Sequence, residues 1–117
     1  MTGKPSDKMR LQHILEAIRE IQNYTDGADV ESFINNSMMY NASLRQLEII
    51  GEAANHLSIE LYQDFPEVPW ARIIGLRNLV IHEYFGVDNL SIWSVISYNL
   101  PDLKERISKI LEIRHNS

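Results

Sequence analysis

Residues 44–57 read LRQLEIIGEAANHL, and the apolar side chains of this segment recur at steps of three and four residues. That spacing places five apolar side chains on one stripe of an α-helix: Leu44, Leu47, Ile50, Ala54 and Leu57. Glu48, Glu52 and His56 follow one another at four-residue steps and form a polar ladder on the helix surface. We therefore predict an amphipathic helix over about residues 37–58.

The same periodicity extends toward the N-terminus. A first helix is predicted to begin after Ser6 or Asp7, either of which can cap it, and to stop at Gly27. Its apolar stripe has six members: Leu11, Ile14, Leu15, Ile18, Ile21 and Tyr24. Asp29 can cap a short helical segment that carries Val30, Phe33 and Ile34.

Toward the C-terminus, residues 63–70 read QDFPEVPW, and the two prolines of this segment break helical structure. We expect an ordered connector with Phe65 and Trp70 as anchors. The next helix is predicted to run from about Trp70 to Tyr84, with Gly86 as its stop. Asp88 can cap a last helical stretch, which Pro101 interrupts or restarts and which frays at residues 114–117.

No alternating strand pattern, internal repeat or linker divides the chain, so we predict one domain over residues 1–117. The fold class predicted is all-α, an antiparallel bundle of four or five helices. The chain is 44% hydrophobic and 23% charged, which is typical of a globular protein. It contains no cysteine, which excludes a disulfide framework, a thiolate zinc site and a cysteine nucleophile.

Charge and targeting features bound the classes of function. Residues 1–8 lack the apolar run of a secretory signal, and no segment is apolar enough to span a membrane, so we expect a cytoplasmic protein without a membrane partner. The formal net charge is −5, which argues against nonspecific coating of nucleic acid. Chemistry on RNA therefore requires a local basic spot, or one assembled between subunits.

Residues 77–84 combine side chains suited to phosphodiester chemistry. His82 can accept or donate a proton near neutral pH. Arg77 stays charged and can hold two phosphate oxygens at once, while Asn78 can hydrogen-bond a phosphate or hold the imidazole in one tautomer. The simplest scheme is attack of an RNA 2′-hydroxyl on the adjacent phosphorus, with Arg77 stabilising the charge that develops and with no metal or cofactor.

Helical geometry constrains that scheme. At about 100° per residue, Arg77 and Tyr84 lie about 20° apart, whereas Arg77 and His82 diverge by about 140°. One straight helix therefore does not direct both groups at one small target. The reach of arginine, a helix distortion before Gly86, or a two-fold dimer that adds the partner's copy could each overcome the divergence.

Residues 75–85, GLRNLVIHEYF, contain Arg-x4-His-x-Tyr and resemble the motif of the HepT-like family in the HEPN superfamily. The resemblance also covers residues 47–54 (LEIIGEAA) in an upstream helix, residues 66–70 (PEVPW) in a connector and residues 100–103 (LPDL) in the final helix. These segments cover most of the chain in the order of the family.

The resemblance implies a HEPN-like homodimer acting as a metal-independent endoribonuclease toxin of a type VII toxin–antitoxin system. Arg77 and His82 would be catalytic at the dimer interface, and the substrate would be RNA and not DNA. The implied partner is a MntA-type minimal nucleotidyltransferase antitoxin that transfers AMP to Tyr84. A bulky anion beside His82 would block the cleft and repel RNA phosphate.

Other interpretations remain open. Arg77 could form a structural ion pair with Glu52 or Glu48, and Glu52 could instead support catalysis by orienting His82. The ladder of Glu48, Glu52 and His56 could hold a metal ion, although an ion-paired surface is the commoner outcome. The alternative function is a non-catalytic helical dimer that binds a nucleotidyltransferase, a nucleotide or both; a bare dimerisation module is a third.

Overall fold

The computed structural model describes residues 6–83 and 89–115, and every regular element within these ranges is helical, which confirms the all-α prediction. In chain order the elements are α1 (Asp7–Tyr24), α2 (Val30–Asn35), α3 (Ser37–Asn55), α4 (Ile59–Asp64), α5 (Trp70–Ile74), α6 (Leu76–Glu83), α7 (Asn89–Ser94), the π-helix η1 (Val95–Asn99) and α8 (Leu100–His115). Tyr84, Gly86 and Asp88 lie outside the described residues.

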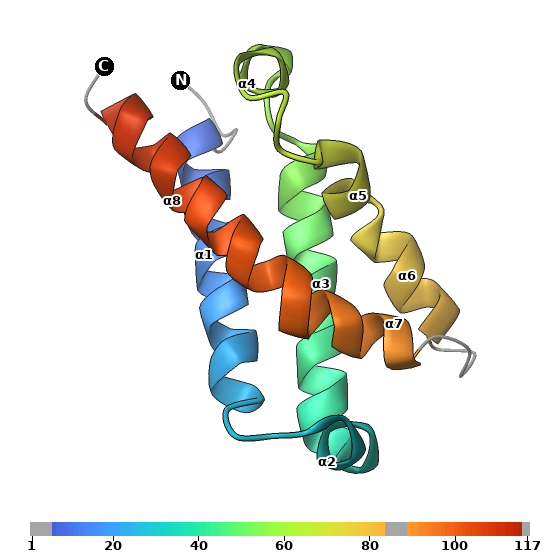
Figure 1. Ribbon diagram of the computed structural model, residues 1–117. Coiled ribbons are helices and arrows are strands. Elements are labelled where there is room, and N and C mark those ends of the chain that lie inside the picture. Colours follow the sequence, from blue (N-terminus) through green and yellow to red (C-terminus); the bar gives the residue numbers. More distant parts are fainter. Residues whose placement is uncertain (1–5, 84–88, 116–117) are drawn as a thin grey trace.

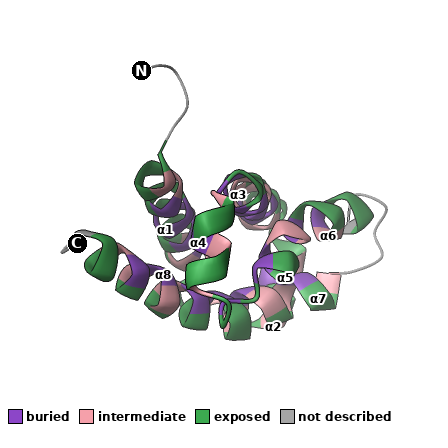
Figure 2. Cartoon of the chain, turned by 90° about the horizontal axis from the view of Figure 1, so that it is seen from above, coloured by how far each residue is buried: buried purple, intermediate pink, exposed green. Residues whose placement is uncertain are grey.

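Helices α1 and α3 run antiparallel along each other, and they form the centre of the bundle (Figure 1). Helix α8 crosses α1 obliquely, while α5 and α6 descend along α3. Viewed from above, the buried faces of α1, α3 and α8 are turned toward one another (Figure 2). The antiparallel bundle is therefore assembled from three long helices and several short ones.

Local side chains define where the helices begin. Ser6, and not Asp7, caps α1: its Oγ accepts a hydrogen bond of 3.1 Å from the Met9 amide. Asp29 caps α2 as predicted, since its Oδ1 accepts a bond of 2.8 Å from the Ser32 amide. Gly27 adopts a φ of 76°, which few other residues tolerate, in the turn after α1.

Asp7 has a different role, which links the start of α1 to the start of α4. Its Oδ1 accepts a 2.9 Å hydrogen bond from the Ser58 amide, and its Oδ2 accepts one of 2.6 Å from the Ser58 hydroxyl. Ser58 in turn caps α4 by accepting from the Leu61 amide. One carboxylate thus holds together two segments that are far apart in the chain.

We expect Asp7→Ala to lower the free energy of unfolding by about 1–3 kcal/mol, because the Ser58 amide loses a charge-assisted partner in a half-buried position. Urea denaturation followed by circular dichroism measures the loss. Asp26→Ala, which removes an exposed carboxylate from the turn after α1, is the control and should change stability by less than about 0.5 kcal/mol. Equal stability of the two variants would contradict the role assigned to Asp7.

The apolar stripes predicted for residues 7–24 and 37–58 form the core. All five members of the second stripe are buried, as are those of the first except Tyr24, which is partly exposed. Phe33 packs its ring against Tyr40 and Trp93, with ring centroids 5.0 Å apart in both pairs. Trp70 is buried, and its indole N–H donates to the Phe65 carbonyl at 2.9 Å, so the connector is anchored as predicted.

Three features differ from the sequence prediction. Residues 59–64 form the separate helix α4, where no helix was expected. The helix predicted from Trp70 to Tyr84 is interrupted at Gly75, which leaves α5 and α6 as distinct segments. Pro101 lies in the first turn of the separate helix α8, so the last stretch restarts there as predicted, but a π-helical turn that was not predicted precedes it. The Leu100 amide bonds to the Val95 carbonyl, and this wider turn accommodates the missing proline N–H.

Candidate functional site

Helices α3 and α6 approach closely at Gly51, and this contact positions Arg77. A methyl group added at Gly51 would lie 2.9 Å from Arg77 Cγ, 3.2 Å from the Arg77 amide nitrogen and 3.3 Å from the Ile74 carbonyl oxygen. These distances are shorter than ordinary van der Waals contact, so the absence of a side chain at residue 51 allows the backbone of α6 to pack against α3.

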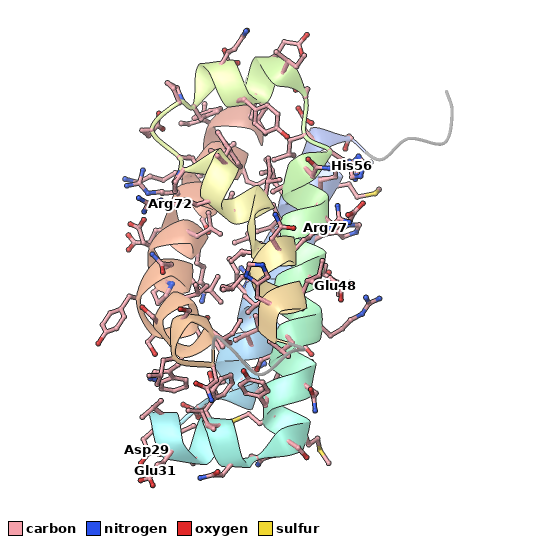
Figure 3. All side chains as sticks on the ribbon, turned by 90° about the vertical axis from the view of Figure 1, so that its right-hand side faces the viewer. Asp29, Glu31, Glu48, His56, Arg72 and Arg77 are labelled. Carbon is pink, nitrogen blue, oxygen red and sulfur yellow. The ribbon has the colours of Figure 1, made fainter. Side chains whose placement is uncertain are left out.

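From this position Arg77 reaches Glu52. Arg77 Nη1 lies 2.9 Å from Glu52 Oε1, and His56 Nε2 lies 2.7 Å from Glu52 Oε2, so one carboxylate joins both side chains. Figure 3 shows Arg77 extending from α6 toward α3, between the levels of His56 and Glu48. The pair between Arg77 and Glu52, which the sequence left as one of two options, is therefore confirmed; His56 was not foreseen as the third member.

The hydrogen bond from His56 has the largest effect on the pKa of Glu52 and lowers it; burial opposes this, and the positive charge of Arg77 lowers the pKa further, so the net direction is downward. Glu52 therefore remains ionised at neutral pH and keeps its ion pair with Arg77. Because the pKa is lower in the folded state, the stabilisation is present above the unfolded-state pKa and is lost as the pH falls through the folded-state pKa. The side chains of Arg77 and Glu52 are each about half exposed, so the contribution of this ion pair to stability is small.

Asn78 and His82 are exposed on α6, and the helix is regular from Leu76 to Glu83. The divergence of about 140° between Arg77 and His82 therefore persists, and no distortion relieves it within those residues. The fold of the chain brings Arg77 onto Glu52 and leaves His82 directed to a different side of α6. Tyr84, the expected site of modification, lies outside the described residues.

The model of the family "Ribonuclease HepT-like" matches residues 14–110, a range that contains the Arg77-to-Tyr84 segment and most of the bundle. The chain belongs to the HepT-like ribonuclease family. "Probable ribonuclease HepT" of Thermococcus cleftensis is 36% identical over 107 residues, which cover 92% of this chain and 97% of that protein. "Putative RNase MJ1380" of Methanocaldococcus jannaschii is 39% identical over 105 residues, 90% of this chain and 96% of that protein.

No solved structure gives a significant match to this HepT-like chain. The family predicted from residues 47–54, 66–70, 75–85 and 100–103 is confirmed by these comparisons.

A surface groove of about 310 Å³ continues from Arg77 across α3 to α1 in this HepT-like chain. Its walls carry four basic side chains and two acidic ones: Arg10, His13, Arg45, Arg77, Glu48 and Glu52. Sequence reasoning did not include Arg10, His13 or Arg45 among the site residues. Their polar positions on α1 and α3 were a usable signal, but the neighbourhood of the two helix faces exists only in the folded chain.

The polar ladder on α3 is an ion-paired surface. Glu48 Oε1 lies 3.5 Å from Arg45 Nη1, and Glu52 contacts Arg77 and His56 as described. Across residues 6–83 and 89–115, no group of three histidine, aspartate or glutamate side chains is placed to hold a metal ion. None of the helices in the described part of the chain is long and apolar enough to cross a membrane.

Proposed function

We propose that this HepT-like protein is the toxin of a type VII toxin–antitoxin system and acts as a metal-independent endoribonuclease. Arg77 and His82 are the catalytic residues, Asn78 and Glu52 support them, and the active site is a cleft at the interface of a homodimer. The observation that supports this most strongly is the match to the ribonuclease HepT-like family over residues 14–110. The exposure of Asn78, His82 and about half of the Arg77 side chain on one short helix agrees with a site open to RNA.

In the proposed reaction, the 2′-oxygen of a ribose attacks the adjacent phosphorus, the bond from phosphorus to the 5′-oxygen breaks, and a 2′,3′-cyclic phosphate forms. The 2′-hydroxyl proton passes to one imidazole, and the leaving 5′-oxygen takes a proton from another. A two-fold dimer supplies both imidazoles, because each subunit contributes its own His82 to a shared cleft. Arg77 stabilises the negative charge on the phosphate oxygens in the transition state.

Glu52 has a positioning role in this scheme. Its carboxylate holds Arg77 through Nη1 at 2.9 Å, while a guanidinium carries five N–H donors in all. Further donors of the same side chain therefore remain for phosphate. The half-exposed setting of the pair allows a phosphate to approach without a large rearrangement.

Two exposed apolar side chains, one of them adjacent to His82 in the sequence, support the proposed dimer. Ile81 on α6 is 50% exposed and Leu90 on α7 is 66% exposed, although their positions in an apolar pattern predict burial. Burial of such side chains against a second copy would stabilise an isologous interface. That interface would add the partner's copy of Arg77 and His82, which overcomes the divergence along one helix.

RNA cleavage in EDTA tests the proposal directly. The purified wild-type protein should cut single-stranded RNA with the chelator present and leave products that end in a 2′,3′-cyclic phosphate. Activity that requires an added divalent cation would contradict metal independence, and intact RNA at high enzyme concentration would contradict the nuclease.

Regulation by a MntA-type nucleotidyltransferase is the second part of the proposal. Co-expression with a MntA-type nucleotidyltransferase should add one or more AMP units to Tyr84 and abolish RNA cleavage, because the added phosphate places negative charge beside His82. Intact-mass measurement and peptide mapping detect the modification. Tyr84→Phe should remain unmodified and active; modification at another residue would contradict the assignment.

The alternative function is a helical dimer that binds a nucleotidyltransferase, a nucleotide or both without catalysis. The ion pair from Arg77 to Glu52 favours it, because a guanidinium held by a carboxylate is a common structural contact. This alternative expects substitutions of Arg77 to weaken partner or nucleotide binding in a protein that cleaves no RNA.

A further inference from the structure

One surface groove differs in charge from the protein as a whole, and we call it the basic groove. It is lined by Arg10, His13, Arg45, Glu48, Glu52 and Arg77. The chain as a whole has a net charge of −5, yet three guanidinium groups and His13 face two carboxylates in the groove. Its residues come from α1, α3 and α6, so the concentration of positive charge is created by the packing of these helices.

The two carboxylates of the basic groove engage only some of the N–H donors of its three arginines. Arg45 is 69% exposed and contacts Glu48 at 3.5 Å, a length at which a hydrogen bond is weak. The Arg10 side chain is half-buried and its guanidinium forms no hydrogen bond or ion pair within the described residues. Arg77 has donors beyond the one that it gives to Glu52.

We propose that the basic groove binds the sugar–phosphate backbone of the RNA on one side of the cleaved bond, with Arg10 and Arg45 contacting phosphates that do not react. This inference rests on the proposed function, because the groove begins at the catalytic Arg77. Arginine is well suited to this role, since it contacts phosphate through paired donors and remains charged at all physiological pH values. Phosphate contacts of this kind position a strand without reading its sequence.

Contact with non-reacting phosphates has a defined kinetic consequence. Arg10 and Arg45 hold the substrate equally in the ground state and in the transition state, so their loss raises KM and leaves kcat nearly unchanged. Arg77, which acts on the reacting phosphate, contributes to kcat. The two classes of arginine in the same groove are therefore separable by kinetics.

Binding of a fluorescein-labelled, fully 2′-O-methylated single-stranded RNA tests the inference without cleavage, because this probe lacks the attacking hydroxyl. Fluorescence anisotropy over a series of salt concentrations gives both affinity and the number of phosphate contacts. We expect Arg10→Ala and Arg45→Ala each to weaken binding several-fold and to reduce the slope of log K against log salt by about 0.7, the value for one phosphate contact to a single strand. Glu48→Gln, which removes a negative charge from the groove, should strengthen binding.

Arg19→Ala is the matched control. Arg19 is exposed on the same helix as Arg10 and points about 180° away from it, so it carries the same charge change on the opposite face of α1. Its affinity and salt slope should equal those of the wild type. If Arg10→Ala and Arg45→Ala bind RNA as tightly as the wild type, the inference is overturned. If these variants lose only the binding of the nucleotidyltransferase, the inference is also overturned, and the groove is assigned to a protein partner.

The failure of this inference is distinguishable from failure of the proposed function. A wild-type protein that binds the methylated RNA in an Arg45-dependent way but cleaves no RNA would retain the basic groove and lose the nuclease. A protein that cleaves RNA with the same KM in wild type and in Arg45→Ala would retain the nuclease and lose the groove.

Discussion

We expect His82→Ala to lower the rate of RNA cleavage by about 10²–10⁴-fold, the usual contribution of a positioned acid or base. The side chain is exposed on α6, so its removal creates no cavity and should leave the helical content unchanged. If both subunits supply an imidazole to a shared cleft, each dimer of the variant loses the base and the acid together. Cleavage of a fluorogenic RNA in EDTA measures the effect.

Two further variants separate proton transfer from other roles of the imidazole. His82→Asn keeps a polar side chain of similar size that does not titrate near neutral pH, so it should lose as much activity as His82→Ala. His56→Ala removes the hydrogen bond to Glu52 at 2.7 Å but no proposed acid or base, so its loss should be within about tenfold. A His82→Asn variant that cleaves RNA at the wild-type rate would remove His82 from the mechanism.

We expect Gly51→Ala to move α6 away from α3 and to lower both stability and activity. The added methyl group would lie 2.9 Å from Arg77 Cγ and within 3.3 Å of two backbone atoms of the segment 74–77. These backbone atoms cannot move aside as the end of a flexible side chain can. Overpacking of this kind costs about 1–3 kcal/mol. Replacement of a mid-helix glycine by alanine gains about 0.5–1 kcal/mol in helix propensity, so we expect a net loss of stability.

The loss of activity in Gly51→Ala should exceed what destabilisation explains. A displacement of about 1 Å at a catalytic group can lower a rate by about 10²-fold, and Arg77 is the residue that the added methyl group contacts most closely. Cleavage assays at a temperature where both proteins are fully folded, together with thermal melting, measure the two effects separately. Asn55→Ala, at the exposed last position of α3, is the control for an alanine substitution outside the contact with α6. A Gly51→Ala protein as stable and active as that control would contradict the close approach.

Most helices of the bundle could be predicted from the sequence because they depend on local patterns. The three- and four-residue spacing of Leu44, Leu47 and Ile50 predicts the buried stripe of α3, and all three are buried. Capping residues define helix starts through hydrogen bonds to amides three positions later, as at Asp29. The break at Gly75 and the π-helical turn before Pro101 were not predicted from the apolar spacing.

The sequence by itself determined the all-α class, the faces that become buried and, through its motif, the family and the segment Arg77 to Tyr84 on which the proposed chemistry depends. Only the tertiary structure decided that Arg77 contacts Glu52 and, through it, His56, and that Arg10 and Arg45 line the groove that begins there. Helical periodicity specifies which face of a helix a side chain occupies, but it carries no information about which other helix packs beside that face. The close approach at Gly51 makes that choice, because it brings together residues of α3 and α6 that are distant in the chain.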